Sequence, residues 1–354
     1  MSLTATRQPA LRVWRHVNFA AYEVGMTLYS MTGWMQRLGM GWLAWELTHS
    51  TFWLGLIAAA DLGPMIVLAP FAGALADRMD SLLLTRLSQF LLMLQAIALV
   101  VLMHYGLITP WALLFIALYA GILYPFSGAG RQTLLPRTVP FAEFAPAIAF
   151  DSALFQVARF VGPAGAAWAI AQWGVIGAFA IHCGGSIVFQ TILAFLRPAP
   201  QAIRQRRSRN LFRDVAEGFA YVRGHGGIGP IFLLMIAASI LIRPIQDMMP
   251  GFVGRIFNGG PTELGFLTSS VGVGACASAV AIAMRGGVTG LTGRIYWGFI
   301  GLALSTFGFV ATDNFTVAVI AVCFLGFTLN TMSTSTQALT QSAVDNDMRG
   351  RVMS

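Results

Sequence analysis

Long apolar runs dominate this chain and constrain its fold more than any other feature. A helix crosses the hydrocarbon core of a bilayer with about 20 mostly apolar residues, and the sequence holds ten runs of about that length or more. These runs are continuous rather than alternating, which excludes a transmembrane β-barrel. The runs are Val17–Trp45, Trp53–Ala76, Leu82–Met103, Pro110–Ala129, Pro146–Gln172, Gly174–Leu196, Ile228–Phe257, Thr262–Met284, Gly293–Ala311 and Phe315–Leu339.

The composition points to the same class of protein. Hydrophobic residues make up 56% of the chain and charged residues 10%, whereas a soluble domain carries about a quarter charged residues. Such a chain cannot cover its surface with water-compatible groups. We therefore expect an all-α polytopic membrane protein.

The basic residues are all arginines, and most of them lie between the apolar runs. Without lysine the chain has no Walker A phosphate loop and no Schiff-base site, which excludes an ATPase and a retinal or pyridoxal protein. With the N-terminus in the cytoplasm, eighteen of the 22 arginines fall on the inner side and Arg255 alone falls outside. This distribution is typical of membrane topology rather than of a nucleic-acid-binding face, and it predicts a cytoplasmic N-terminus.

The sequence offers no recognisable metal, cofactor or enzyme motif. Cys183, Cys276 and Cys323 lie inside apolar runs without metal-ligand or disulfide spacing, and the five histidines are scattered. A polytopic membrane enzyme is one alternative to a transporter, but the chain lacks His-Glu-x-x-His and Gly-x-Ser-x-Gly. A non-transporting membrane sensor is another alternative, disfavoured because these residues include no soluble signalling domain.

A polar, arginine-rich gap divides the chain into two parts. We expect a six-helix bundle over residues 1–196, a cytoplasmic basic linker over 197–227 and a four-helix bundle over 228–354. Within the linker, Leu211, Val215, Phe219 and Val222 recur at helical spacing, which predicts an amphipathic helix on the membrane surface.

Two short matches indicate an internal repeat in the same orientation. Leu54-Gly55 recurs as Leu264-Gly265 at an offset of 210 residues, and Gln132-Thr-Leu recurs as Gln337-Ala-Leu at an offset of 205. Parallel repeats of this kind are typical of two-bundle transporters. Because the first repeat is followed by two further spans, we expect 6 + 4 of an original 6 + 6 helices and a truncated, transport-inactive chain.

Several motifs along the chain form a recognisable set. They are Trp42-Leu-Ala-Trp-Glu-Leu-Thr48, Gly73-Ala-Leu-Ala-Asp77-Arg78, Arg131-Gln-Thr-Leu-Leu-Pro136, Arg159-Phe-Val-Gly162-Pro163-Ala-Gly165, Gly259-Gly-Pro-Thr-Glu-Leu-Gly265 and Met348-Arg-Gly-Arg-Val-Met-Ser354. Together they resemble the exporters of the major facilitator superfamily over almost the whole chain. The resemblance is closest to the drug and siderophore branch that includes the enterobactin exporter and macrolide efflux proteins.

The resemblance implies a secondary active exporter with a two-bundle fold. Since the chain lacks nucleotide-binding machinery, we expect proton-coupled antiport of a small amphipathic solute such as a drug or siderophore. The expected partners are that solute, protons and the lipid bilayer, with no nucleic acid and no cofactor. The expected protein is a monomer in the bacterial inner membrane.

Gly73, Asp77 and Arg78 are the expected gating motif. Gly73 and Asp77 lie one turn apart on one helix face, and in the family this motif closes the cytoplasmic side of the outward-open state. Ser81 and Leu82 stand where the family usually has basic residues. The alternative is a charge pair that only marks the membrane interface.

Four carboxylates are candidates for proton coupling. Asp61 lies eight residues into its run, near the bilayer midplane, where an ionised carboxylate must face a cavity, find a partner or take up a proton. The alternative for Asp61 is a fixed internal hydrogen bond. Asp151, Asp247 and Glu23 are the other candidates.

Two intramembrane arginines accompany these carboxylates. Arg159 precedes Gly162, Pro163 and Gly165, which match the family's helix-5 motif without its usual Gly-Gly ending. Arg243 lies one turn before Asp247 and forms a local pair with it in the simplest interpretation.

The remaining candidates line the expected central cavity. Trp34, Met35, Phe155 and Met248 would suit a bulky, partly apolar solute, although such residues more often serve as packing. Glu23 and Arg37 are expected near the two membrane interfaces, since the first run is longer than one span requires.

Overall fold

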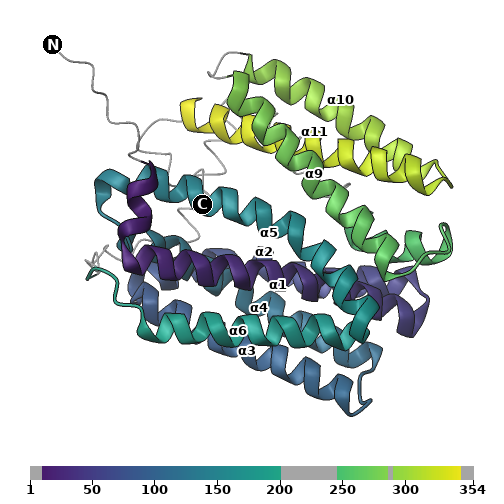
Figure 1. The fold of residues 1–354 in the computed structure, drawn as a ribbon, viewed down its shortest axis with the longest axis horizontal. Helices are drawn as coiled ribbons and strands as arrows, with labels where there is room; N and C mark the ends of the chain where they lie inside the picture. Colours follow the sequence, from purple (N-terminus) through teal and green to yellow (C-terminus); the bar gives the residue numbers. More distant parts are fainter. Residues whose placement is uncertain (1–9, 201–244, 286–289, 344–354) are drawn as a thin grey trace.

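The computed structural model describes residues 10–200, 245–285 and 290–343, and every regular element within them is helical (Figure 1). Residues 245–255 are also helical. Short 3-10 helices η1 (Ala10–Arg15), η2 (Leu135–Arg137) and η3 (Phe141–Glu143) flank the long ones. The long helices are α1 (Val17–Thr48), α2 (Thr51–Arg78), α3 (Ser81–His104), α4 (Pro110–Leu134), α5 (Phe144–Trp173), α6 (Val175–Phe195), α9 (Pro261–Arg285), α10 (Leu291–Val310) and α11 (Phe315–Ala343).

The long helices confirm the expected polytopic membrane fold. In the described part of the chain, seven helices are long and apolar enough to cross a membrane by length and composition, and α1 and α10 fall outside that set. Residues 201–244 and 344–354 lie outside the described residues. The predictions for the amphipathic linker helix, for Arg243 and for the motif at 348–354 therefore concern segments outside the described structure.

The helices are arranged in two bundles (Figure 1). In the first bundle α1 packs on α5 and α6, α3 packs on α4 and α6, and α2 packs on α4. In the second bundle α11 packs on both α9 and α10. Among the labelled helices, the bundles meet where α9 packs along α5.

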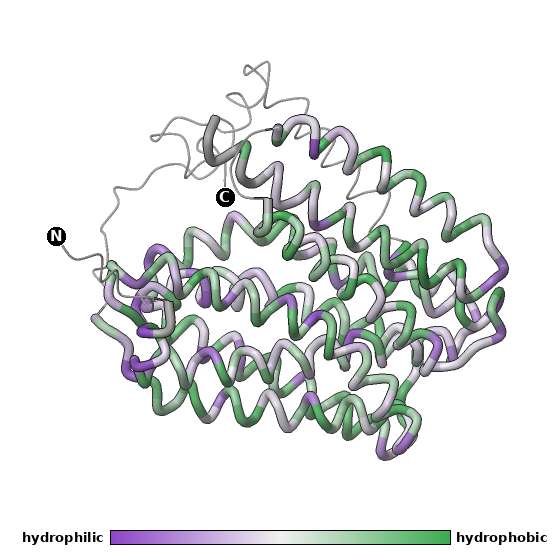
Figure 2. Tube along the Cα trace, turned by 45° about the horizontal axis from the view of Figure 1, so that its top comes forward, coloured by the Kyte–Doolittle hydropathy of each residue, from purple (hydrophilic) through white to green (hydrophobic). Residues whose placement is uncertain are grey.

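Hydrophobic residues dominate the lengths of most helices, as Figure 2 shows, and many large apolar side chains are exposed. Ile66 of α2 is 77% exposed, Phe115 of α4 is 63% exposed and Phe307 of α10 is 73% exposed. Exposed apolar side chains on this scale are the normal surface of a helix that faces lipid.

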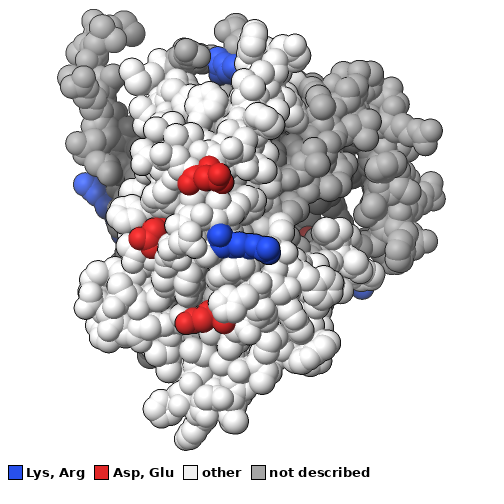
Figure 3. Space-filling model, turned by 90° about the vertical axis from the view of Figure 1, so that its right-hand side faces the viewer, with Lys and Arg blue, Asp and Glu red and all other residues white. Residues whose placement is uncertain are grey.

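The two ends of the molecule differ in charge. The end where α1 begins and α2 finishes carries most described arginines and is called the arginine-rich end below. Figure 3 shows the opposite end, whose face is mostly uncharged. The charged residues close to that opposite end are Glu46, Arg255, Glu263 and Asp313.

Local signals in the sequence set the helix boundaries. Asp80 caps α3 by accepting a hydrogen bond from the backbone N–H of Leu83 at 3.0 Å. In the same way, the hydroxyl of Thr109 caps α4 by accepting a hydrogen bond from the backbone N–H of Ala112 at 3.1 Å. Pro110 follows Thr109 as the first residue of α4, where its missing N–H costs nothing. The capped turns bring each helix back antiparallel to its predecessor.

Candidate functional site

An arginine and two aspartates form an ion triad where the two bundles meet. Arg37 of α1 donates from Nη2 to Asp247 Oδ1 at 2.8 Å, and its Nη1 lies 3.4 Å from Asp61 Oδ2. Asp61 belongs to the first bundle, whereas Asp247 lies in helical segment 245–255 of the second. The guanidinium of Arg37 therefore joins a carboxylate from each bundle.

The triad lies near the middle of the helices. Asp61 is ten residues into α2, or about 15 Å at 1.5 Å per residue. Because Arg37 pairs with Asp61, the expectation that Arg37 lies near a membrane interface is wrong. Because α1 has 32 residues, its ends extend beyond the hydrocarbon core of the bilayer, and Arg37 lies within that core. Opposite charges at hydrogen-bonding distance offset part of the cost of placing ions at this depth.

Arg37 and Asp247 occupy matching positions in the two repeats. They are 210 residues apart, the same offset that relates Leu54 to Leu264 in the sequence. Parallel repeats place equivalent residues on either side of a two-fold axis that runs along the membrane normal. The ion pair therefore joins two positions that the repeat offset relates. Sequence reasoning missed this pair, although the repeat offset contained the signal.

Trp34 lies beside the triad and contacts two guanidiniums. The Cζ atoms of Arg37 and Arg159 lie 5.9 and 5.6 Å from the centre of its ring, within the range of cation–π attraction. The ring of Phe155 stands edge-on to the same indole at 6.4 Å. Two of the expected cavity residues, Trp34 and Phe155, thus lie together with one of the intramembrane arginines.

The helix-5 motif positions Trp34 against α5. A Cβ atom at Gly162 would lie 2.5 Å from Trp34 Cβ and 2.6 Å from the carbonyl oxygen of Met31, so only glycine permits this approach. Met35 is 7% exposed and packs against Gly165 in the apolar core. The expectation that Met35 lines a cavity is therefore wrong, because its side chain points about 100° around α1 from Trp34 and packs in the apolar core.

We expect Gly162→Val to destabilise the protein and to displace Trp34. The added side chain meets backbone as well as the tryptophan, and overpacking of this kind costs about 1–3 kcal/mol. Thermal unfolding in detergent, followed by tryptophan fluorescence, should show a lower transition temperature. Gly128→Val is the control, since nothing lies within 4 Å of a Cβ there, and equal stability of the two variants would contradict the assignment.

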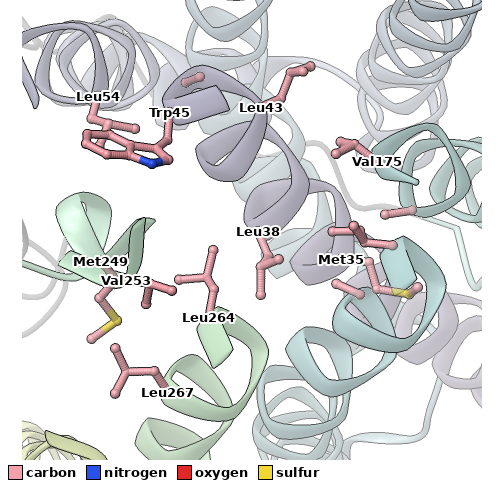
Figure 4. Packing of buried hydrophobic residues seen from close by; sticks show 14 of the residues in the cluster. Met35, Leu38, Leu43, Trp45, Leu54, Val175, Met249, Val253, Leu264 and Leu267 are labelled. Carbon is pink, nitrogen blue, oxygen red and sulfur yellow. The ribbon is translucent and has the colours of Figure 1, made fainter. Parts of the chain in front are cut away.

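An apolar seal joins the bundles between the triad and the opposite end of the molecule. Its members come from α1, α2, α9 and the segment 245–255, and Figure 4 shows them facing one another. Each is 7% exposed or less. The apolar seal consists of Leu38, Trp45, Leu54, Met249, Val253, Leu264 and Leu267.

Trp45 fits the seal because two glycines leave room for its indole. A Cβ atom at Gly254 would collide with Nε1 of Trp45 and lie 2.7 Å from Cε2, while one at Gly251 would lie 3.5 Å from Cζ3. On the other helix, a Cβ at Gly41 would lie 3.2 Å from Pro250 Cγ. The two helices therefore cross in close contact at this level.

The other contacts between the bundles extend from mid-helix toward the same end. Gln156 of α5 donates to Asn330 of α11 at 3.2 Å. Closer to the opposite end, Gly272 and Gly265 of α9 pack against α5, and a Cβ at Gly272 would lie 2.8 Å from Phe160 Cα. Among the residues that the structure describes, these contacts hold the bundles together from mid-helix to the end opposite the arginine-rich end.

The gating motif lies at the arginine-rich end, away from the triad. Asp77 and Arg78 are exposed and form no ion pair with any residue that the structure describes, and nothing lies within 4 Å of a Cβ at Gly73. Close by, Arg137 donates to Asp80 at 3.0 Å and to Ser81 at 2.7 Å. Arg137 thereby supplies a guanidinium in a loop that lacks the family's usual basic residues.

The remaining carboxylates lie in the half of the first bundle nearer the arginine-rich end. Glu23 of α1 is only 1% exposed, and its Oε1 has no hydrogen-bond partner. Asp151 of α5 is half-buried and interacts electrostatically with Glu23 and with Arg131 of α4. These residues form a second ionisable group, separate from the triad.

Among the described residues, the site is built from ion pairs, amides and aromatic rings. No three His, Cys, Asp or Glu side chains of that part of the chain are grouped so that they could hold a metal ion. Cys183, Cys276 and Cys323 are free thiols on three different helices. The arrangement suits reversible ion pairing and solute binding rather than bond-making chemistry.

Comparison with known proteins identifies the family. Residues 10–354 match a family model described as transmembrane secretion effector, a group of the major facilitator superfamily. Macrolide efflux protein A of Streptococcus pyogenes is 21% identical over 343 residues, which cover 96% of this chain and 84% of that protein. The staphyloferrin A transporter of Staphylococcus aureus is 22% identical over 92% of this chain and 82% of its own length.

Solved structures share the fold. The nucleoside transporter NupG aligns with a TM-score of 0.69 at 13% identity, over 95% of this chain and 85% of that one. A bacterial homologue of the iron transporter ferroportin, in an inward-facing state, aligns with a TM-score of 0.64 at 15% identity, over 99% and 87%. The chain therefore belongs to the transmembrane secretion effector family of the major facilitator superfamily, a family of transporters rather than of enzymes.

Proposed function

We propose that the protein exports a small amphipathic solute across the cytoplasmic membrane of a bacterium in exchange for protons. The names of its relatives, a macrolide efflux protein and a staphyloferrin A transporter, support export of a bulky solute. Trp34, Phe155 and the half-buried Met248 offer the apolar surface for such a solute beside the charged groups. Their place between two bundles is the usual place for a transporter's solute.

The observation that carries the proposal is the pairing of Arg37 with carboxylates from both bundles. An antiporter must switch between its inward-facing and outward-facing states only when it carries a solute or a proton, and must not switch when it is empty. The Arg37–Asp247 pair forms only while Asp247 is ionised, so it holds the empty, unprotonated protein in one state. A proton on the carboxylate, or a solute that competes for the triad, weakens this latch and permits the change.

The contacts between the bundles support an inward-facing state. In the described part of the chain, the triad, the apolar seal and the close approaches of Gly265 and Gly272 to α5 lie between mid-helix and the end opposite the arginine-rich end. The positive-inside rule assigns the arginine-rich end to the cytoplasm, together with the N-terminus. The seal then closes the external side, and Asp77 is free to act as a cytoplasmic gate when the protein faces outward. Two complementary bundles in one chain are consistent with a monomer.

We expect Asp61→Asn to abolish export driven by a proton gradient while solute binding is largely kept. The amide retains the shape of the carboxyl group but cannot take up a proton at the middle of the membrane. Gradient-driven efflux from reconstituted vesicles, with binding measured separately, tests this result.

Asp313→Asn is the matched control, because Asp313 is an exposed carboxylate between α10 and α11. Its variant should export like the unmodified protein. If the Asp61→Asn variant exports as well as the unmodified protein and with the same dependence on pH, Asp61 takes no part in proton coupling. Asp151 or Asp247 then becomes the candidate for the coupling carboxylate. If the unmodified protein moves none of the tested drugs and siderophores, the proposed solute class is wrong.

A further inference from the structure

A chain of hydrogen bonds connects α5 of the first bundle with α9 and α11 of the second. Gln156 on α5 donates from Nε2 to Asn330 Oδ1 on α11 at 3.2 Å. Asn330 in turn donates from Nδ2 to the carbonyl oxygen of Ala275 and to Oγ of Ser278 on α9, both at 3.3 Å. Ser278 Oγ lies 2.6 Å from Oγ1 of Thr331, and Thr331 donates to a backbone carbonyl of its own helix at 2.8 Å. The ion triad uses none of these side chains.

This chain of hydrogen bonds fixes the orientation of both amides. Thr331 has one hydroxyl hydrogen, which its own helix accepts, so Ser278 donates to Thr331 and accepts from Asn330. Both hydrogens of the Asn330 amide are then used, and its Oδ1 faces α5. Gln156 therefore presents Nε2 to Asn330, and its Oε1 takes no part in the chain.

The Oε1 atom of Gln156 is an acceptor that the described residues leave unsatisfied. It is buried and has no hydrogen-bond partner in that part of the chain. A buried acceptor without a donor is costly, and the cost is recovered when a donor reaches it. Because the amide is held in place and its desolvation has already occurred, a ligand that brings a donor gains more here than at a hydrated acceptor.

Gln156 borders the face of α5 that carries the expected solute-binding aromatic. Ser152 is exposed, Phe155 is 45% exposed, and with Arg159 they occupy positions i, i+3 and i+7, so they share one face. The guanidinium of Arg159 lies 5.6 Å from the ring centre of Trp34, which places this face at the aromatic pair. The half-buried Gln156 follows Phe155 directly. Its Oε1 is covered in this conformation, so a solute displaces a neighbouring side chain when it binds.

The surroundings of Gln156 select the kind of group that pairs with it. The guanidinium of Arg159, one turn along α5, disfavours a cationic ammonium group on the solute. An ether or ester oxygen brings no hydrogen and leaves Oε1 unsatisfied. A neutral hydroxyl or amide N–H group fits both conditions.

We propose that Gln156 is a specificity-determining residue whose Oε1 accepts a hydrogen bond from a neutral hydroxyl or amide N–H group of the exported solute. Its Nε2 stays on Asn330, so the second bundle holds the acceptor in position. This role rests on the proposed export of a small amphipathic solute, and it adds the polar group that such a solute carries.

Equilibrium binding of two matched macrolides to the purified full chain tests this role. The two are erythromycin and a derivative whose hydroxyl groups are methylated, which removes the hydroxyl donors. The unmodified protein should bind erythromycin at least about tenfold more tightly. Gln156→Met has a similar length but no acceptor oxygen, and it should reduce this preference to less than about threefold. The bulk of the methyl groups acts on both proteins, so the change in preference isolates the hydrogen bond.

Gln190→Met is the matched control. Gln190 on α6 is also half-buried, donates from Nε2 to the carbonyl oxygen of Arg86 at 3.3 Å, and has a buried Oε1 without a partner among the described residues. Because α6 packs on helices of the first bundle, Gln190→Met should leave the preference unchanged within about twofold. Gln156→Glu keeps an acceptor oxygen at the same length and should retain a preference of at least about threefold, which separates loss of the acceptor from misfolding.

The outcomes separate this role from the proposed export. An unchanged preference in Gln156→Met, or a lost preference in Gln156→Glu or Gln190→Met, would overturn the role of Oε1 while the proposed export stands. Equal binding of the two macrolides to the unmodified protein would have the same meaning. If the unmodified protein binds neither macrolide, the proposed solute class fails, and the role of Gln156 fails with it.

Discussion

Asp247→Asn is expected to open the external side of the protein. The substitution removes the ion pair at 2.8 Å that joins the second bundle to Arg37, while Arg37 keeps Asp61 as a partner. A hydrogen bond between charged groups contributes about 1.5–3 kcal/mol, which corresponds to a shift of about tenfold to a hundredfold between two states. The population that faces outward should rise by a factor in that range.

Thiol labelling from outside the cell measures this opening. A cysteine placed at Val253, which is fully buried in the apolar seal, should react slowly with a membrane-impermeant maleimide in an otherwise cysteine-free protein. Asp247→Asn should raise the labelling rate at least tenfold and reduce gradient-driven export. The same experiment tests the orientation, because the seal is reached from outside only if the arginine-rich end is cytoplasmic.

Asp61→Asn is the matched control for the latch. It removes the other carboxylate of the same guanidinium but leaves the pair between the bundles intact. Labelling at position 253 should therefore stay close to its original rate. Equal labelling of the two variants would contradict the assignment of Asp247 as the residue that links the bundles.

Hydropathy and arginine placement predict the helices of this protein well, because the position of each helix depends on the sequence within and next to it. The runs Leu82–Met103 and Phe315–Leu339, for example, correspond closely to α3 and α11. The relation between the bundles depends on residues far apart in the chain. Arg37 pairs with Asp247, which lies 210 residues later in the chain, and the local sequence around Arg37 does not predict that partner.

Helix faces explain the errors at the site. Trp34 and Met35 are neighbours in sequence, yet successive residues point about 100° apart around a helix. Trp34 therefore faces Arg159, while Met35 faces the packed core near Gly165. Sequence alone identifies both as large apolar residues and does not orient α1. The repeat offset would have helped, since it relates Arg37 to Asp247 directly.

Gly254→Val is expected to prevent the external side from closing. The indole of Trp45 occupies the space that any side chain at position 254 requires, and Trp45 is only 6% exposed, so it has little room to move. A collision of this kind destabilises the closed contact but not the open one. The protein should remain outward-facing, with export reduced at least about a hundredfold if the closed state loses about 3 kcal/mol.

A compensating substitution separates this blocked closure from general misfolding. Trp45→Ala creates the space that a valine at position 254 requires. The double variant Trp45→Ala/Gly254→Val should therefore recover part of the lost export, and Leu54 should again be buried. A cysteine at Leu54, which is 3% exposed in the seal, reports the state through maleimide labelling from outside. Labelling should be fast in Gly254→Val and slower in the double variant.

Gly55→Val provides the matched control for the closed contact. Gly55 also lies in a helix near the end opposite the arginine-rich end, but nothing lies within 4 Å of a Cβ there, so a valine should leave export and labelling unchanged. If Gly254→Val transports normally, the Trp45 contact is not required for the cycle. If it loses export while the cysteine at Leu54 stays protected, the defect lies elsewhere and the apolar seal is not the external gate.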